Sequence, residues 1–172
     1  MPQQKTEYWL SGPVEGIAPL LQPVAHAILQ SQREVQDVLQ DFPAALLWQR
    51  PGAVAPVAFH VQHIAGVIDR LFTYAREEEL STVQWEALQQ EGMENSSLTS
   101  GLLLQSLHEQ VEKALEQLRM TKEESLLHKR YVGRKRIPSN VLGLLFHAAE
   151  HVQRHTGQLL VTTRVVLAAD AP

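Results

Sequence analysis

Hydrophobic positions recur along most of the chain at intervals of three and four residues, the spacing that gathers side chains on one face of an α-helix. The first such stretch predicts a helix that begins near Pro13 or Pro19 and ends at Asp41, just before Pro43. Pro23 lies inside this pattern, and a proline in a helix interior breaks or kinks the helix. The helix is therefore expected either to begin later or to bend at this residue.

The same periodicity predicts three further long helices. They cover residues 57–76, 102–119 and 140–167. Thr99 or Ser100 is expected to cap the helix at 102–119, and Ser139 is a favourable N-cap residue for the last one. The end of the last stretch is rich in β-branched residues, but no neighbouring segment resembles a pairing strand, so it is interpreted as helix.

The segments between the long helices carry weaker patterns. A short helix that contains Trp85 is expected over 81–90, and one or two helical turns over 121–127. The basic stretch at 128–136 is interpreted as a solvated loop. Four long amphipathic helices without a strand signal predict an all-α fold, a four-helix bundle with a short extra helix between the second and third long helices. Residues 1–172 are expected to form one domain, with an irregular lead-in at 1–12 and a tail at 168–172.

Composition narrows the classes of function. The 172 residues carry a formal net charge of −4, which argues against nucleic acid as the main partner. The chain has no cysteine, so disulfides, thiolate metal sites and cysteine nucleophiles are excluded. Neither a signal peptide nor a membrane-spanning stretch is recognised, and a cytoplasmic protein without a membrane partner is expected.

Histidines form two clusters on the predicted helices. His147, His151 and His155 follow one another at intervals of four, and His60 and His63 lie in the second long helix. If the two helices are neighbours, these side chains meet inside the bundle. A divalent metal ion is one partner that satisfies several imidazoles at once, and hydrogen bonding within the core is the alternative.

Other polar residues near the clusters are assigned lesser roles. Glu150 lies about 100° around the helix from His151, so it is expected to be a surface residue or to support a ligand, not to be a ligand itself. Gln158 either orients a group at the site or simply packs. Gly157 is expected to allow a close approach between helices, and His26 to be a surface or core residue.

Two segments together resemble a known family. The first runs from Trp48-Gln49-Arg50-Pro51-Gly52 to His63-Ile64-Ala65-Gly66, and the second is His151-Val152-Gln153-Arg154-His155-Thr156-Gly157-Gln158. In this order they resemble the DinB/YfiT-like superfamily of metal-dependent proteins. The helix order is similar over nearly the whole chain, whereas the specific motif covers only these two segments. The resemblance implies a four-helix bundle of left-handed topology that is often a homodimer.

The resemblance also implies a metal site and a range of chemistry. Its ligands would be His63, His151 and His155, binding a divalent ion such as zinc or nickel. His60 and His147 would lie outside this triad, as supporting groups, substitute ligands or core residues. Characterised relatives include transferases that use bacillithiol or mycothiol and a mycothiol-dependent maleylpyruvate isomerase. A small-molecule substrate, with a low-molecular-weight thiol, would therefore be the partner.

Three histidine ligands leave coordination positions open, which is typical of a catalytic metal site and not of a structural one. Such a metal lowers the pKa of a bound water or thiol. The sequence therefore predicts a metal-dependent transferase or hydrolase. The alternative is a non-catalytic helical bundle, with a structural or vestigial metal site or with dimerisation as its role.

Overall fold

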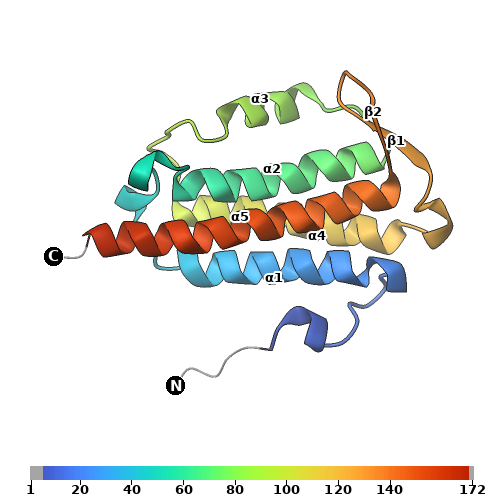
Figure 1. Ribbon diagram of the computed structural model, residues 1–172, viewed down its shortest axis with the longest axis horizontal. Coiled ribbons are helices and arrows are strands. Elements are labelled where there is room, and N and C mark those ends of the chain that lie inside the picture. Colours follow the sequence, from blue (N-terminus) through green and yellow to red (C-terminus); the bar gives the residue numbers. More distant parts are fainter. Residues whose placement is uncertain (1–5, 171–172) are drawn as a thin grey trace.

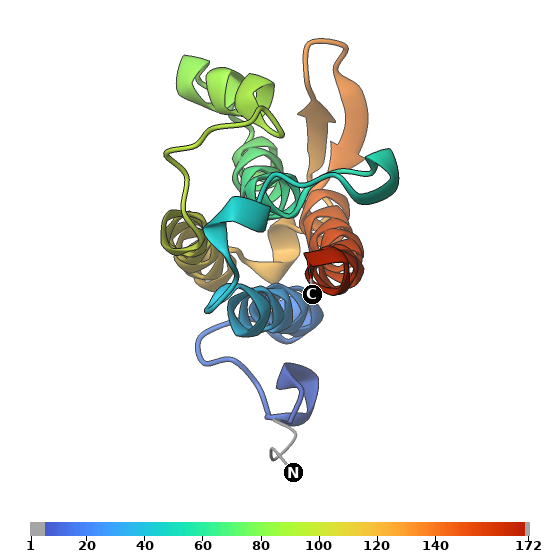
Figure 2. The same ribbon diagram turned by 90° about the vertical axis from the view of Figure 1, so that its left-hand side faces the viewer.

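Four long helices form the body of the protein, as Figure 1 shows. The computed structural model describes residues 6–170. The long helices are α1 (Gln22–Leu39), α2 (Val57–Ala75), α4 (Ser100–Met120) and α5 (Val141–Asp170). Viewed from one end, α1 and α2 lie at opposite corners of the bundle, and each packs against both α4 and α5 (Figure 2). The all-α fold class and the four-helix bundle are confirmed.

Helix α2 is the most apolar of the long helices and runs antiparallel to its neighbour α5 (Figure 1). Together with the turn before it, the segment Pro51–Ala75 is long and apolar enough to cross a membrane by length and composition. Half of the most apolar part of this segment is buried inside the bundle. Since the core helix of a bundle meets the same criteria, this is weak evidence for a membrane span.

The start of α1 shows how the helix accommodates its proline. A single 3₁₀ turn, Pro19–Leu21, leads directly into α1, which begins at Gln22. Pro23 therefore occupies the first helical turn, where its missing N–H group has no helical partner to lose. The later start is the correct alternative, and the helix ends at Leu39, two residues before the expected end.

A β-hairpin replaces the solvated loop that was expected at 128–136. Strand β1 (Lys129–Val132) pairs antiparallel with β2 (Ile137–Asn140), and Val132 lies opposite Ile137. The prediction of no strands was wrong, because strands of four residues are too short to show a clear alternation among so many charged residues. The glycine signal was present: Gly133 has a φ of +63° in the turn between the strands.

The hairpin is anchored at its base, because two strands alone are only marginally stable. Arg130 Nε donates a hydrogen bond of 2.8 Å to the carbonyl of Ala75, at the end of α2. The Arg130 guanidinium also forms an ion pair of 3.4 Å with Glu77. The hairpin therefore holds the C-terminal end of α2 against the start of α5.

The caps of the later helices correct one expectation. The Asn140 carboxamide accepts a hydrogen bond of 2.7 Å from Gly143 N, so Asn140 caps α5. The assignment of Ser139 as its cap was wrong, because Ser139 pairs with Arg130 in the hairpin. Thr99, one of the two expected residues, caps α4 by accepting from Leu102 N.

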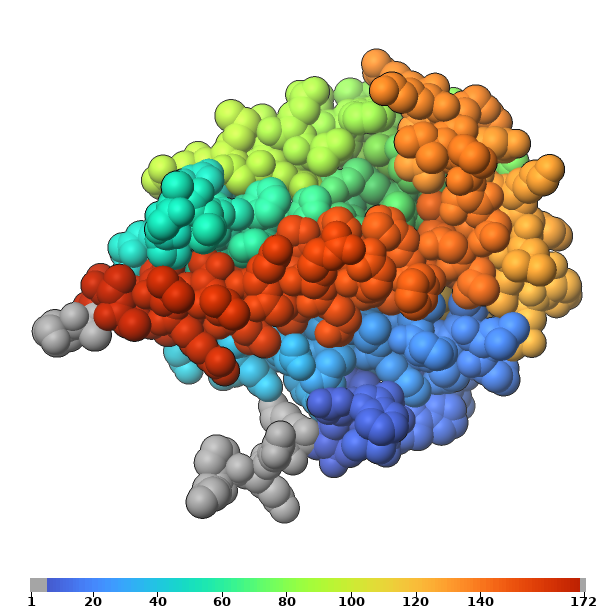
Figure 3. Space-filling model, viewed as in Figure 1, coloured from blue at the N-terminus to red at the C-terminus, as the bar shows by residue number. Residues whose placement is uncertain are grey.

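Short helix α3 (Thr82–Gln90) confirms the extra helix between the second and third long helices. Ser81 and Gln84 form a capping box at its start, which satisfies two backbone N–H groups. The Gln84 side chain also donates 2.9 Å hydrogen bonds to Asp69 and Thr73, so α3 is fixed to the outer face of α2. In the space-filling view α3 and the hairpin stand on the same side of the bundle (Figure 3).

The remaining boundaries differ little from expectation. Glu123–Ser125 forms one 3₁₀ turn within 121–127, and Tyr8–Leu10 forms another within the lead-in. The tail expected from residue 168 was wrong, because α5 continues to Asp170 through two alanines, which are the best helix formers. The parts of the lead-in and tail at 1–5 and 171–172 lie outside the described residues.

Gly92, just after α3, is predicted to be essential for docking that helix. Its φ is +78°, and an added Cβ would lie 2.9 Å from the Phe59 ring on α2. We expect Gly92→Ala to lower the free energy of unfolding by about 2–4 kcal/mol, through backbone strain and overpacking. Urea unfolding measures this loss.

Gly133→Ala is the matched control. Gly133 also has a positive φ, +63°, but a Cβ there would meet nothing within 4 Å. Gly133→Ala should therefore lower the free energy of unfolding only through backbone strain, by about 1–2 kcal/mol. Equal losses in the two variants would show that Phe59 does not restrict Gly92.

Candidate metal centre

Three histidines from two antiparallel helices converge between α2 and α5. His63 lies on α2, and His151 and His155 lie one turn apart on α5. Each offers one ring nitrogen, and these three atoms all lie within 4.8 Å of one another. The Nε2 atoms of His63 and His151 are 3.0 Å apart. Two nitrogens bound to one tetrahedral zinc ion at its usual bond length would lie about 3.3 Å apart, close to the observed separation.

A carboxylate that the sequence analysis did not single out holds His63. The Nδ1 atom of His63 donates a hydrogen bond of 2.6 Å to Glu91 Oε2, and Arg70 binds the other carboxylate oxygen. With Nδ1 donating to Glu91, the lone pair of Nε2 is directed into the site. A carboxylate behind a histidine is the common way in which proteins orient a metal ligand.

The Glu91 carboxylate is kept ionised in this position. Burial raises the pKa of Glu91, but hydrogen bonds from His63 and Arg70 outweigh that effect, and the pKa lies below its ordinary value. The carboxylate therefore remains an acceptor for the His63 N–H at neutral pH. Sequence spacing gives no signal for this contact, because α3 and its following turn bring Glu91 back across α2 after 28 residues.

His155 is supported by a second histidine. Its Nδ1 lies 3.2 Å from Nδ1 of buried His60. Burial first, and then the neighbouring His63, lower the pKa of His60 by more than a hydrogen bond with the backbone of Ala55 raises it, so His60 is neutral near pH 7. When the other His60 nitrogen donates to Ala55, His60 Nδ1 is free to accept the proton of His155 Nδ1. The remaining nitrogen of His155, Nε2, then keeps its lone pair.

The remaining ligand candidate, His151, has a nitrogen without a hydrogen bond. Within the described part of the chain, Nδ1 of His151 is buried and has no partner. Burial, and then the charges of His63, His147 and Arg154, lower the pKa of His151, against a smaller opposite effect of Glu150. His151 is therefore neutral, the form in which imidazole binds metals.

Burial and the neighbouring rings also lower the pKa of His155, and by a larger amount. Burial first, and then the neighbouring rings of His63, His151 and His60, lower the pKa of His155 to about 4. Near neutral pH His151 and His155 thus offer nitrogen lone pairs without positive charge. A soft or borderline divalent cation suits three neutral imidazoles, so the residues fit a divalent metal ion.

The aromatic ring of Phe59 limits the site on one side. It stacks on His63 with 5.1 Å between ring centroids and an interplanar angle of 15°. The same ring lies edge-on to His155, at 6.1 Å. An apolar wall of this kind restricts the rotation of His63 and lowers the local dielectric around the three nitrogens.

Other candidates from the sequence lie at the edge of the site or away from it. Exposed His147 and half-buried Glu150 lie 2.7 Å apart, from His147 Nδ1 to Glu150 Oε1, and with His151 they make a second group that could hold a metal ion. Glu150 also pairs with Arg154. His26 is held elsewhere, with Nε2 3.0 Å from the carbonyl of Gly12.

Gly157 and Gln158, which follow His155 after one buried residue, have no part in packing the site. Gly157 is exposed, and a Cβ added there would meet nothing within 4 Å. The expectation that Gly157 permits close helix packing was therefore wrong for this chain. Gln158 is exposed as well, because both residues fall on the outer face of α5.

Comparison with known proteins identifies the family. The model of the DinB superfamily matches residues 27–159, a span that includes all three converging histidines. The chain therefore belongs to the DinB superfamily. No curated protein matches it.

A solved structure supports the same fold. The chain is similar to the crystal structure of the conserved protein of locus from Enterococcus faecalis, with a TM-score of 0.67 and 17% sequence identity. The similarity covers 86% of this chain and 97% of the other. At this identity, the likeness concerns the fold alone.

Removing the Glu91 carboxylate is predicted to weaken metal binding while leaving the histidines in place. We expect Glu91→Ala to lower the affinity for zinc about 10- to 100-fold, the usual effect of losing such a support. Competition with a chromogenic chelator measures the affinity. Glu86→Ala on the exposed face of α3 is the matched control and should bind zinc as the unmodified protein does. Equal affinities in all three proteins would show that Glu91 does not support the metal ligands.

His60 is predicted to act as a hydrogen-bond acceptor for His155. Asn places a carbonyl oxygen near the position of His60 Nδ1, whereas Leu fills similar space without any acceptor. We therefore expect His60→Asn to keep zinc affinity within about threefold and His60→Leu to lose about tenfold or more. The same competition assay compares them, and equal affinity in the two variants would contradict this role.

Proposed function

We propose that the protein binds a single divalent metal ion, zinc or nickel, through His63, His151 and His155. The observation that carries the proposal is the convergence of three ring nitrogens within 4.8 Å of one another. Support comes from the partners behind two of these rings, Glu91 and His60. Residues with only a packing role would not need an ionised carboxylate or an oriented tautomer.

We further propose that the site serves a transferase or hydrolase reaction on a small molecule. A metal held by three imidazoles supplies a Lewis acid with open positions, which favours the deprotonated form of a bound water or thiol. The chain contains no cysteine, so a thiol nucleophile would come from a low-molecular-weight cosubstrate. Membership of the DinB superfamily supports this reading of the site.

The residues around the three nitrogens have distinct tasks in this proposal. Glu91 and Arg70 fix the orientation of His63, and His60 fixes that of His155. Phe59 excludes water from one side. Homodimer formation and a cytoplasmic location stay predictions from the sequence.

Metal content of the purified protein tests the ligand set. We expect about one ion per chain in the unmodified protein, and loss of the ion in His63→Ala, His151→Ala and His155→Ala, because two imidazoles bind too weakly to retain it. Inductively coupled plasma mass spectrometry measures the content. His147→Ala is the matched control, since His147 lies on α5 one turn from His151 but outside the triad.

Three results would overturn the proposal at different levels. Failure to bind zinc or nickel, even when either is added, would remove the metal site altogether. Retention of metal in His63→Ala and His155→Ala, with loss in His147→Ala and His151→Ala, would place the ion at His147, Glu150 and His151 instead. A bound ion without any turnover of thiol or ester substrates would favour the alternative, a non-catalytic bundle.

A further inference from the structure

A cavity lies between α3 and the β-hairpin, away from the histidine group. Its volume is about 580 Å³, and its lining includes Trp85, Val132, Arg134, Lys135 and Ile137. None of the converging histidines contributes to its lining. Cavities that hold small molecules usually measure about 300–1,000 Å³, so this one is large enough for a ligand of that class.

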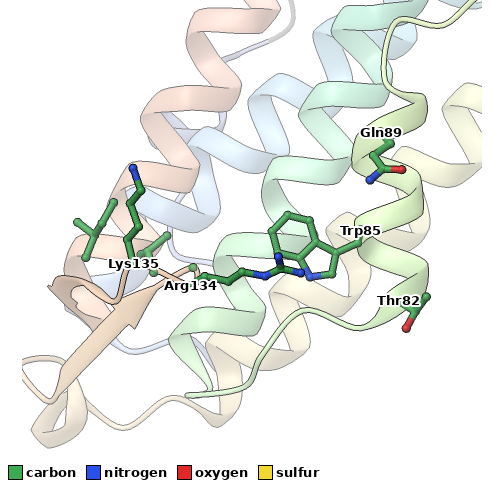
Figure 4. Close-up of a pocket in the computed structure, with 8 residues that line it drawn as sticks. Thr82, Trp85, Gln89, Arg134 and Lys135 are labelled. Atoms are coloured by element: carbon green, nitrogen blue, oxygen red, sulfur yellow. The ribbon is translucent and has the colours of Figure 1, made fainter.

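Aromatic and cationic side chains face each other across this cavity. Trp85 reaches from α3 towards the hairpin, and Arg134 reaches back from the hairpin turn, as Figure 4 shows. The guanidinium carbon of Arg134 lies 5.4 Å from the centre of the Trp85 ring. This stacking fixes the direction of the guanidinium but uses none of its N–H donors.

The hairpin turn presents two cations at once. Arg136 N donates to the carbonyl of Gly133, which closes the turn and leaves Arg134 and Lys135 at its centre. Below the turn, Val132 and Ile137 are paired across the strands and give the cavity an apolar floor.

Neither cation at the turn is neutralised by the described part of the chain. Arg134 and Lys135 form no ion pair or hydrogen bond with any described residue, and Arg134 contacts the Trp85 ring through a cation–π interaction. Other arginines on this side of the bundle do have carboxylate partners: Arg130 pairs with Glu77, and Arg70 pairs with Glu91. The cavity thus combines an apolar surface with two unneutralised positive charges.

We propose that this cavity binds a small organic anion with an aromatic or apolar body. The body packs between Trp85 and the apolar floor, and the anionic group takes charge-assisted hydrogen bonds from Arg134 and Lys135. The limited volume of the cavity, about 580 Å³, suits a small molecule better than an extended acidic peptide. The proposal goes beyond the metal centre and does not depend on it.

A link to the metal centre follows from the chain itself. Gln89, which lines the cavity, is two residues from Glu91, which orients His63. The hairpin leads directly into α5, which carries His151 and His155. At the rise of an α-helix, Trp85 is about 9 Å along the chain from Glu91. An anion in this cavity therefore lies beside the segment that positions the metal ligands.

The test uses the full-length protein and the fluorescent aromatic sulfonate 8-anilinonaphthalene-1-sulfonate. Its uncharged relative N-phenyl-1-naphthylamine has the same aromatic body without the anionic group. We expect the sulfonate to bind at least tenfold more weakly to Arg134→Gln and to Trp85→Leu. Arg136→Gln is the matched control: it loses the same charge from the same hairpin, but Arg136 stacks on Tyr131 outside the cavity and should change binding less than twofold.

The proposal requires both losses and a preference for the anion. Equal binding to Arg134→Gln and Arg136→Gln would overturn it, as would unchanged binding to Trp85→Leu. Equal affinity for the neutral dye would mean that the cavity binds only the apolar body, which would also overturn the proposal. Circular dichroism checks that each variant is folded.

One further comparison distinguishes binding of the sulfonate in this cavity from binding at the metal centre. Sulfonate binding should be the same within twofold with and without added zinc, and in His151→Ala. Loss of binding in His151→Ala, with retention in Trp85→Leu, would place the dye at the histidine group and overturn the proposal. Failure of metal binding alone would leave the cavity proposal intact.

Discussion

Burying several imidazoles close together is the constraint on which the site depends. Rings from α2 and α5 approach to 4.4 Å between the centroids of His63 and His155, and such neighbours cannot all carry positive charge. Burial and mutual repulsion keep His151 and His155 neutral. A neutral imidazole still has one donor and one acceptor nitrogen, and each of these needs a partner.

The surrounding structure provides most of these partners and leaves the lone pairs in the centre. The Glu91 carboxylate accepts a hydrogen bond from His63, and His60, which is hydrogen-bonded to Ala55, accepts one from His155. This arrangement explains why α3 and the turn after it are fixed so firmly to α2. The Gln84 contacts hold one end, and at the other end Gly92 N donates to the Gln62 side chain at 3.0 Å. The connection between the second and third long helices is thus part of the site.

The sequence predicted the fold and the two histidine clusters because both follow from local periodicity, whereas the choice of His63, His151 and His155 within those clusters came from the family resemblance. The 3.6-residue pattern defines the long helices, and a spacing of four places His151 and His155 on one stripe. That His63 meets them required only that α2 and α5 be neighbours. Glu91 and Arg70 could not be found in this way, because their contact with His63 depends on how a short helix folds back across α2. The hairpin was missed for a similar reason: its stability comes from Arg130 and the helix ends that it bridges, not from its own sequence pattern.

X-ray absorption spectroscopy of the zinc-loaded protein tests the central claim most directly, because it reports the ligands of the metal itself. The account predicts three imidazole nitrogens at about 2.0–2.1 Å, with one or more oxygen scatterers in the remaining positions. His155→Ala, which is expected not to retain the ion, should lose this imidazole scattering. Four imidazoles with no oxygen, or a single imidazole in an oxygen-rich shell, would contradict an open site formed by His63, His151 and His155.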